Sequence, residues 1–218
     1  MPKSRTKSWR AFDPTAYAAG RTAAGAAVIG VTPVSPRAPA RALSKATAIV
    51  RIAPAVKVRI LGIDPGSRRM GFGVIECKGS NSTQLAHGCV VGGAGPLNER
   101  LRLIFEGVQQ LIEQYNPDEV AIERVFLNRN VDSALKLGHA RGAALCAVPR
   151  AVPVFEYAPR AIKLAVVGYG AAEKEQVAHM IRVLLGVEGR ISTDASDALA
   201  IALCHANSRR MHLLGATR

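Results

Sequence analysis

Four acidic residues have the chemical type and the surroundings that metal-assisted phosphate chemistry requires. Asp64 and Glu123 each end a short apolar run, and Asp194 and Asp197 lie three residues apart near the start of a predicted helix. That spacing places the last two carboxylates on one face of the helix. Carboxylate oxygens are preferred ligands of Mg²⁺, and two such ions about 4 Å apart can promote an in-line displacement at phosphorus.

Each of these acids also has an ordinary structural explanation when it is considered alone. Asp64 precedes Pro-Gly and suits a turn, while Asp194 and Asp197 suit the first turn of a helix, where the helix dipole favours acids. Glu123 is simply the last residue of a strand-like segment. The combination favours function, because convergent carboxylates repel one another and a cluster of them does not serve stability.

The surrounding pattern predicts an α/β fold built on a five-stranded mixed sheet. Short runs of aliphatic and β-branched residues predict strands at 58–63, 71–76, 85–91, 119–123 and 152–157. Apolar residues at three- and four-residue spacing, with their flanking turn residues, predict helices at 97–115, 132–148, 161–167, 173–185 and 192–205. The first three strands suggest an antiparallel meander.

A strand–helix–strand crossover should make strands 58–63 and 119–123 parallel and close neighbours. Asp64 and Glu123 would then lie at the carboxyl ends of parallel strands, the edge at which ligands bind in open α/β sheets. Helix 132–148 is apolar around most of its circumference and is therefore expected to be buried.

The distribution of charge divides the chain into three parts. Residues 1–57 contain ten Lys or Arg and one acid, and so carry +9 of the net charge of +13. We expect this Pro- and Ala-rich segment to be a disordered basic extension, either an over-extended translation start or a dispensable tail. Added DNA affinity and targeting are the alternatives. Residues 58–206 form the expected catalytic domain, and 207–218 a flexible basic tail.

The order and content of several blocks resemble one known family, the RuvC Holliday-junction resolvases of the ribonuclease H-like superfamily. The resemblance covers essentially all of 58–205. It rests on LGIDPGSRRMGFGVIE at 61–76, AIERVF at 121–126, DSALKLGHARG at 132–142, VFEYAPR at 154–160, AAEKEQVAHM at 171–180 and DASDALAIA at 194–202. It implies a crossover junction endodeoxyribonuclease that resolves four-way junctions by paired symmetric nicks in DNA recombination and repair.

The same resemblance implies roles for individual residues. Asp64, Glu123, Asp194 and Asp197 match the catalytic cluster of the family, which would hold Mg²⁺, two ions per active site, with Mn²⁺ as a substitute. The family further implies a homodimer, to whose interface helix 132–148 contributes, and a branch-migration motor of RuvA and RuvB as partner.

Six further residues are candidates for contact with DNA. Phe126 could stack on a base at the opened centre of the junction, although it could equally be a core residue that caps the strand. The others are basic and could bind phosphate, although solvated surface positions are the ordinary explanation: Arg68, Arg69, Arg129, Lys163 and Lys174. Arg124 and Lys136 are weaker candidates.

Other activities fit less well. A nuclease for another nucleic acid shares the fold, but the Phe126 loop and the dimer helix argue against it. An actin-like ATP-binding protein needs a second domain for which the chain has no room, and a non-cutting junction-binding scaffold gains nothing from four acids.

The four cysteines suggest reduced, mostly buried thiols, and His205 is expected to be structural. No run is long enough to span a membrane, so we expect a cytoplasmic protein.

Overall fold

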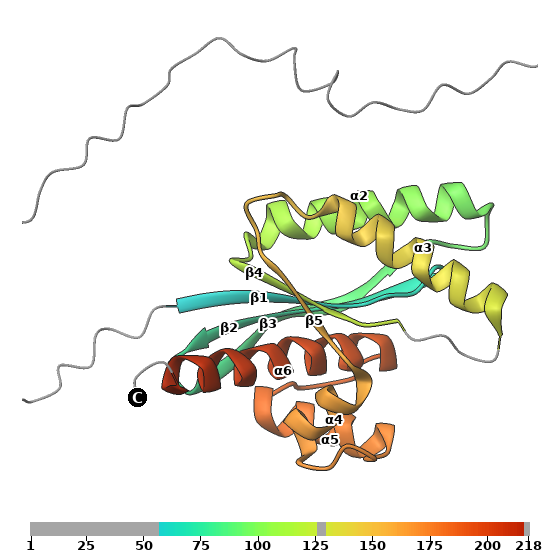
Figure 1. The fold of residues 1–218 in the computed structure, drawn as a ribbon. Coiled ribbons are helices and arrows are strands. Elements are labelled where there is room, and N and C mark those ends of the chain that lie inside the picture. Colours follow the sequence, from blue (N-terminus) through green and yellow to red (C-terminus); the bar gives the residue numbers. More distant parts are fainter. Residues whose placement is uncertain (1–56, 126–129, 216–218) are drawn as a thin grey trace, which may run out of the picture. The chain divides into compact units, whose positions relative to one another are not determined.

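Five strands form one mixed sheet in the part of the chain that the computed structural model describes, residues 57–125 and 130–215 (Figure 1). The strands are β1 (Lys57–Asp64), β2 (Arg69–Lys78), β3 (Asn81–Val91), β4 (Glu119–Glu123) and β5 (Val154–Tyr157). Their order is β3-β2-β1-β4-β5. The first three pair antiparallel, whereas β4 pairs parallel with both β1 and β5. The predicted meander and the predicted parallel pair are both confirmed.

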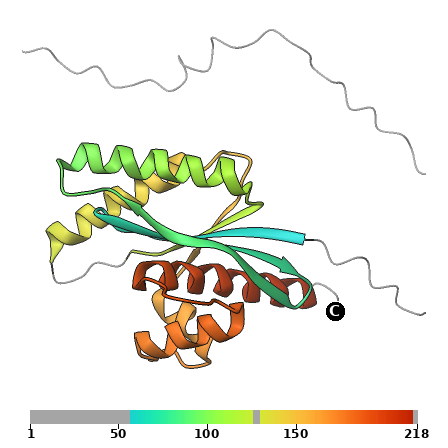
Figure 2. The ribbon, with the colours of Figure 1, turned by 180° about the vertical axis from the view of Figure 1, so that it is seen from behind.

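Helices cover both faces of this sheet. They are α2 (Leu97–Tyr115), α3 (Val131–Ala147), α4 (Pro159–Val167), α5 (Lys174–Leu185) and α6 (Thr193–Gly215). Figures 1 and 2 show α2 and α3 on one face and α6 on the other, with α4 and α5 packed outside α6. None of the helices that the structure describes is long and apolar enough to cross a lipid bilayer.

The alternation of side chains along β1 and β4 divides the interior into two cores. Leu61 and Ile63 pack with α2 and α3, whereas Ile60 packs with α4, α5 and α6. Strand β4 alternates in the same way, with Val120 and Ile122 on the α2 side and Ala121 on the α6 side. Because the strand period is two, the final residues of both strands, Asp64 and Glu123, belong to the α6 face.

Glycines in the sheet allow α6 to lie unusually close to it. A Cβ atom added to Gly62 would be 2.2 Å from the backbone oxygen of Ala198, and one added to Gly73 would be 2.7 Å from the side chain of Leu199. Small residues of α6, among them Ala198 and Ala202, face these glycines. The start of α6 is therefore held directly against the strands that end in the site.

His205 is a structural residue, as predicted. Its side chain is buried in α6 and stacks on Phe155 of β5, with ring centroids 4.2 Å apart. Burial lowers the pKa of His205, an effect that hydrogen bonding to Glu119 opposes. The neutral ring donates from Nε2 to Glu119 and accepts at Nδ1 from the hydroxyl of Tyr157, both at 2.7 Å. These contacts fasten α6 to β4 and β5.

Two expectations about the last helix and its continuation were wrong. Helix α6 continues to Gly215, so residues 207–215 are helical and do not form a flexible tail. Tertiary contacts explain the difference: Asn207 Nδ2 donates to the backbone oxygen of Ala165 at 3.1 Å, and Arg209 pairs with Glu119 at 2.9 Å.

Of the predicted extension 1–57, only Lys57 lies within the described residues, and it is the first residue of β1.

Helix α3 is less buried than its composition predicts. Only Ala140, Ala144 and Ala147 are buried, and they pack with the core beneath α2. Val131 and Leu135 are 62% and 58% exposed in the single chain. The expectation for the cysteines is also corrected, because all four thiols are free as predicted but only Cys204 is buried.

Candidate active site

Strand register brings the first two acids together. Ile63 of β1 is paired with Ile122 of β4, so the next residues, Asp64 and Glu123, lie side by side at the same end of the sheet. Neighbouring strands are about 4.8 Å apart, which is within reach of strong charge interaction. The sequence prediction that both acids lie at one edge of the sheet is consistent with this register.

The amino-terminal turn of α6 brings the second pair to the same edge. Gly71 is opposite Asp64 in the β1–β2 pairing, and a Cβ atom on Gly71 would be 2.0 Å from the backbone oxygen of Asp194. The side chain of Ser192 accepts from the N–H of Ala195 at 3.3 Å, as an N-cap does. Only a glycine at position 71 allows the helix to begin so close to the end of β1.

The other three acids act electrostatically on Asp64. Burial, and after it the negative charges of Glu123, Asp197 and Asp194, together raise the pKa of Asp64 from 3.8 to about 7. Burial also raises the pKa of Glu123, with a contribution from Asp197. Crowded carboxylates of this kind favour either a proton or a bound cation.

Two of the acids are paired with basic side chains of their own chain. Arg69 Nε lies 3.2 Å from Asp194, and Lys174 Nζ lies 3.5 Å from Asp197. Burial raises the pKa of Asp197, and Lys174 opposes that rise. With these side-chain positions, no group of three or more His, Cys, Asp or Glu in residues 57–125 and 130–215 has metal-binding geometry. Asp194 and Asp197 would have to turn from their basic partners to share an ion with Asp64.

The structure places four of the six predicted DNA-contact residues around the acids. Arg69 and Lys174 are the ion-pair partners of Asp194 and Asp197. Burial raises the pKa of Asp197, whereas the positive charges of Lys174 and Lys163 lower it. Arg68 is exposed beside the turn that follows β1. Phe126 and Arg129 lie outside the described residues.

The two weaker basic candidates are engaged with acids. Arg124 lies 3.7 Å from Glu156, and Lys136 pairs with Asp132 one helical turn away. Their charges are therefore partly neutralised within the chain. This reduces the positive potential that either offers to a phosphate.

Three surface hollows surround the acidic cluster. One of about 520 Å³ is lined by Asp194 together with Arg68, Arg69, Arg100 and Lys136. A second, of about 320 Å³, is lined by Asp197 together with Lys174 and Arg182. The third is the largest, about 700 Å³, and includes Lys163 among its lining residues. Each hollow contains at least two cations, as a surface that tracks a phosphate backbone requires.

Comparison with known proteins identifies the family. The sequence profile of "Crossover junction endodeoxyribonuclease RuvC" matches residues 60–205. The chain belongs to the RuvC family. The RuvC of Maricaulis maris is 55% identical over 163 residues, which are 74% of this chain and 98% of that protein. The RuvC of Methylococcus capsulatus is 51% identical over 153 residues, 70% of this chain and 92% of the relative.

Solved structures agree with this assignment. "T. thermophilus RuvC in complex with Holliday junction substrate" is 38% identical, with a TM-score of 0.67 over 71% of this chain and 96% of that one. A second Thermus thermophilus RuvC structure has a TM-score of 0.64 at 39% identity. The predicted ribonuclease H-like fold and the enzyme class, an endodeoxyribonuclease, are therefore both confirmed.

Several residues that support the site of this RuvC-family chain gave no recognisable signal in the sequence. Arg100 is buried in α2 and donates from Nη1 to the Ser67 hydroxyl at 3.0 Å, which braces the turn after β1. Arg141 of α3 donates to the backbone oxygen of Glu123 at 3.3 Å. Cys89 of β3 lies 3.7 Å from Asp194. All three depend on contacts between segments far apart in the chain.

Proposed function

We propose that this chain resolves four-way junction DNA by paired nicks, with Asp64, Glu123, Asp194 and Asp197 as ligands of catalytic Mg²⁺. The observation that carries the proposal is the convergence of four carboxylates from β1, β4 and α6 at one edge of the sheet. Their mutual repulsion, which contributes to the raised pKa of Asp64, is relieved when divalent cations bind. The Thermus thermophilus relative, whose structure contains a Holliday junction, supports the choice of substrate.

The donor set suits hard divalent ions. Carboxylate oxygens with a few waters match the coordination that Mg²⁺ prefers, and Mn²⁺ accepts the same ligands. When two such ions are bound, they polarise the scissile phosphate and neutralise charge during the displacement. The negative charges of all three other acids act on the pKa of Asp64, after burial. Asp64 would therefore hold bound Mg²⁺ together with the other three acids.

The basic side chains of the site would orient the substrate. Lys174 and Lys163 act on Asp197, and Arg69 is paired with Asp194, so a strand that reaches the acids passes these cations. A phosphate at this position exchanges the carboxylate partner of Arg69 or Lys174 for its own oxygens. The same charges stabilise the additional negative charge that develops at phosphorus in the transition state.

Paired nicks require two active sites, and we propose that a homodimer supplies them. Val131 and Leu135 of α3 are exposed large apolar residues, which favours contact with a second copy through this helix. The proposed setting is the cytoplasm, where a motor formed by RuvA and RuvB would deliver the junction.

Cleavage of a synthetic four-way junction tests the assignment of the acids. Wild-type protein with Mg²⁺ should nick two strands symmetrically. Asp64→Asn should reduce the rate by at least about 1,000-fold, because charge stabilisation at phosphorus is lost, while junction affinity is retained. Glu113→Gln is the matched control, since Glu113 is an exposed acid of α2 on the opposite face of the sheet.

Measurable cutting by Asp64→Asn at the wild-type rate would disprove the metal-site assignment. Binding of the junction by wild-type protein without any nicking would instead favour a non-cutting scaffold.

A further inference from the structure

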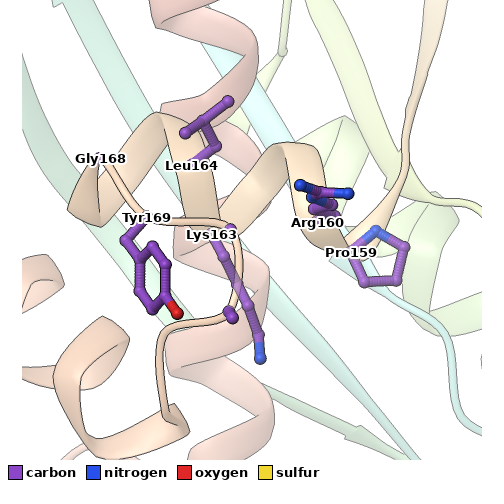
Figure 3. A pocket seen from close by; sticks show the side chains of 8 residues that line it. Pro159, Arg160, Lys163, Leu164, Gly168 and Tyr169 are labelled. Atoms are coloured by element: carbon purple, nitrogen blue, oxygen red, sulfur yellow. The ribbon is translucent and has the colours of Figure 1, made fainter.

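A hollow runs along α4 and the loop that follows this helix (Figure 3). It measures about 700 Å³, and its lining consists of Pro159, Arg160, Lys163, Leu164, Gly168, Tyr169, Gly170 and Ala171. Two of these residues are cations and none is an acid. Tyr169 is 63% exposed, which is a high exposure for an aromatic side chain.

The backbone around this hollow is well defined by hydrogen bonds. Gly168 ends α4 with a φ of 80°, and its N–H donates to the backbone oxygen of Leu164 at 2.9 Å. The N–H of Ala172 then donates to the oxygen of Tyr169 at 3.2 Å, which closes the turn. These bonds hold Tyr169 at the rim, away from the apolar core.

Gly170 brings the loop against Arg160. A Cβ atom on Gly170 would be 2.8 Å from Arg160 Cγ and 3.1 Å from Arg160 Nε. The absence of a side chain at position 170 therefore lets the stem of Arg160 lie along the loop. Figure 3 shows the ammonium of Lys163 and the phenol of Tyr169 pointing the same way, with Arg160 and Pro159 across from Tyr169.

Both cations of the hollow keep their charge available. Among residues 57–125 and 130–215, neither Arg160 nor Lys163 forms an ion pair. By contrast, Arg69 and Lys174 both pair with acids of the cluster. Unpaired cations attract an anion more strongly than cations already neutralised within the chain.

The hollow is also next to the candidate active site. Helix α4, which contributes Lys163 to the lining, packs directly against α6, the helix that carries Asp194 and Asp197. Helix α4 is fastened to α6 through Asn207, whose side chain donates to the oxygen of Ala165 at 3.1 Å. The hollow and the four acids are therefore carried by elements that pack against one another.

We propose that the hollow bordered by Arg160, Lys163 and Tyr169 is a nucleotide subsite, in which the two cations hold a phosphate of the junction DNA and Tyr169 stacks on the adjoining unpaired base. This assignment rests on the proposed function, which supplies the DNA. One flat aromatic face beside two free cations matches the two chemical parts of a nucleotide. An acidic peptide would engage the cations but would leave the exposed ring of Tyr169 without a partner.

Binding of a fluorescent four-way junction by the full chain tests the subsite, with Ca²⁺ replacing Mg²⁺ so that the DNA is held without cutting. Tyr169→Ala should raise the Kd about 5- to 20-fold, because the stacking partner is lost, whereas Tyr169→Phe should stay within about twofold. Arg160→Gln should reduce the dependence of log Kd on log salt by roughly one unit, and Tyr169→Ala should leave it unchanged. Val183→Ala is the matched control, since Val183 of α5 is also 63% exposed and does not line the hollow.

A base analogue distinguishes stacking from general attraction. Junctions that carry 2-aminopurine next to the scissile phosphate should be quenched by the wild type and by Tyr169→Phe, and not by Tyr169→Ala. An unchanged Kd and unchanged quenching in Tyr169→Ala would overturn the subsite. If the wild type still cleaved the junction, that result would not contradict the proposed function. An equal loss of affinity for a linear duplex would overturn the stacking of an unpaired base. Failure of the wild type to bind or cut junctions would overturn both proposals.

Discussion

At the scale of single residues, the main feature of the site is the concentration of negative charge around Asp64. Its folded-state pKa of about 7 lies above the ordinary value of 3.8, chiefly because of burial and then because of the neighbouring carboxylates. The folded protein therefore binds a proton at Asp64 more tightly than the unfolded chain does. The stability that this provides is complete below about pH 4 and is lost as the pH rises through about 7.

Metal-free protein should show this dependence directly. In EDTA, the free energy of unfolding of the wild type should fall between about pH 5 and pH 8 by on the order of 2 kcal/mol more than that of Asp64→Asn. Urea unfolding at both pH values measures the difference. A parallel pH dependence of the two proteins would show that Asp64 ionises normally in the fold.

Arg69 illustrates how a cation can influence a neighbouring acid. Its guanidinium lies 3.2 Å from Asp194 and 3.4 Å from the thiol of Cys89. Because the pair is largely exposed, solvent screens it and its contribution to stability is small. In Arg69→Gln, we expect the Mg²⁺ concentration for half-maximal cleavage to fall about two- to fivefold, since residue 69 no longer competes with the metal for Asp194.

Junction affinity should weaken in the same variant, because a positive charge near the DNA is removed. Titration of cleavage with Mg²⁺ at saturating junction separates the two effects. Arg182→Gln is a useful comparison, since Arg182 lines the adjacent hollow without an ion-pair partner among the described residues. An unchanged Mg²⁺ requirement in Arg69→Gln would show that Arg69 does not compete with the metal.

At the scale of elements, the close contact of α6 with β1 and β2 positions half of the acids. Gly62, Gly71 and Gly73 leave no room for side chains under this helix. Asp194 lies in the first turn of the helix, and its backbone oxygen is packed against Gly71. A displacement of α6 therefore moves Asp194 and Asp197 relative to Asp64 without touching any acid.

Gly71→Ala tests the importance of this contact. The new Cβ atom would be 2.0 Å from the backbone oxygen of Asp194, so the start of α6 must shift. We expect a loss of about 1–3 kcal/mol in the free energy of unfolding and a large loss of cleavage. Gly142→Ala is the control: a Cβ atom there meets nothing within 4 Å and should be neutral or slightly stabilising in α3. Equal stability of Gly71→Ala and wild type would show that α6 does not need to pack this closely against β2.

At the scale of the whole molecule, the net charge is unevenly distributed. Residues 1–57 carry +9 of the +13, while the described domain has its positive charge in hollows around the acids. We therefore propose that attraction to DNA by the basic segment and recognition of a junction by the domain are separable contributions.

Deletion of residues 2–56 should leave junction cleavage at about 200 mM salt within a few-fold of the wild type. The deletion retains Lys57, which begins β1 and pairs with Glu76 at 2.9 Å. Affinity at about 50 mM salt should fall more than affinity at about 200 mM, because distant charges are screened at higher salt. Loss of folding or of cleavage would show that the segment is part of the working enzyme.

Local patterns were sufficient to predict most of the architecture. The helix at 97–115 and the strand at 119–123 have their predicted bounds, and the last helix begins within one residue of its predicted start. The failures occurred where tertiary contacts decide the outcome. Residues 207–215 look polar and unstructured in the sequence. In the fold, Arg209 of α6 forms an ion pair with Glu119 of β4, and the helix continues to Gly215.

The parallel relation of β1 and β4 and the enzyme family follow from residue types, spacing and the order of motifs, and the same features nominate the four acids as the proposed site. Those features are local or are imposed by the handedness of chain connections. The side-chain alternation that puts Asp64 and Glu123 on the α6 face needs the observed packing. The close packing of α6 on Gly71 and the unpaired cations beside Tyr169 also need the observed packing. Each depends on segments that approach one another only after the chain has folded.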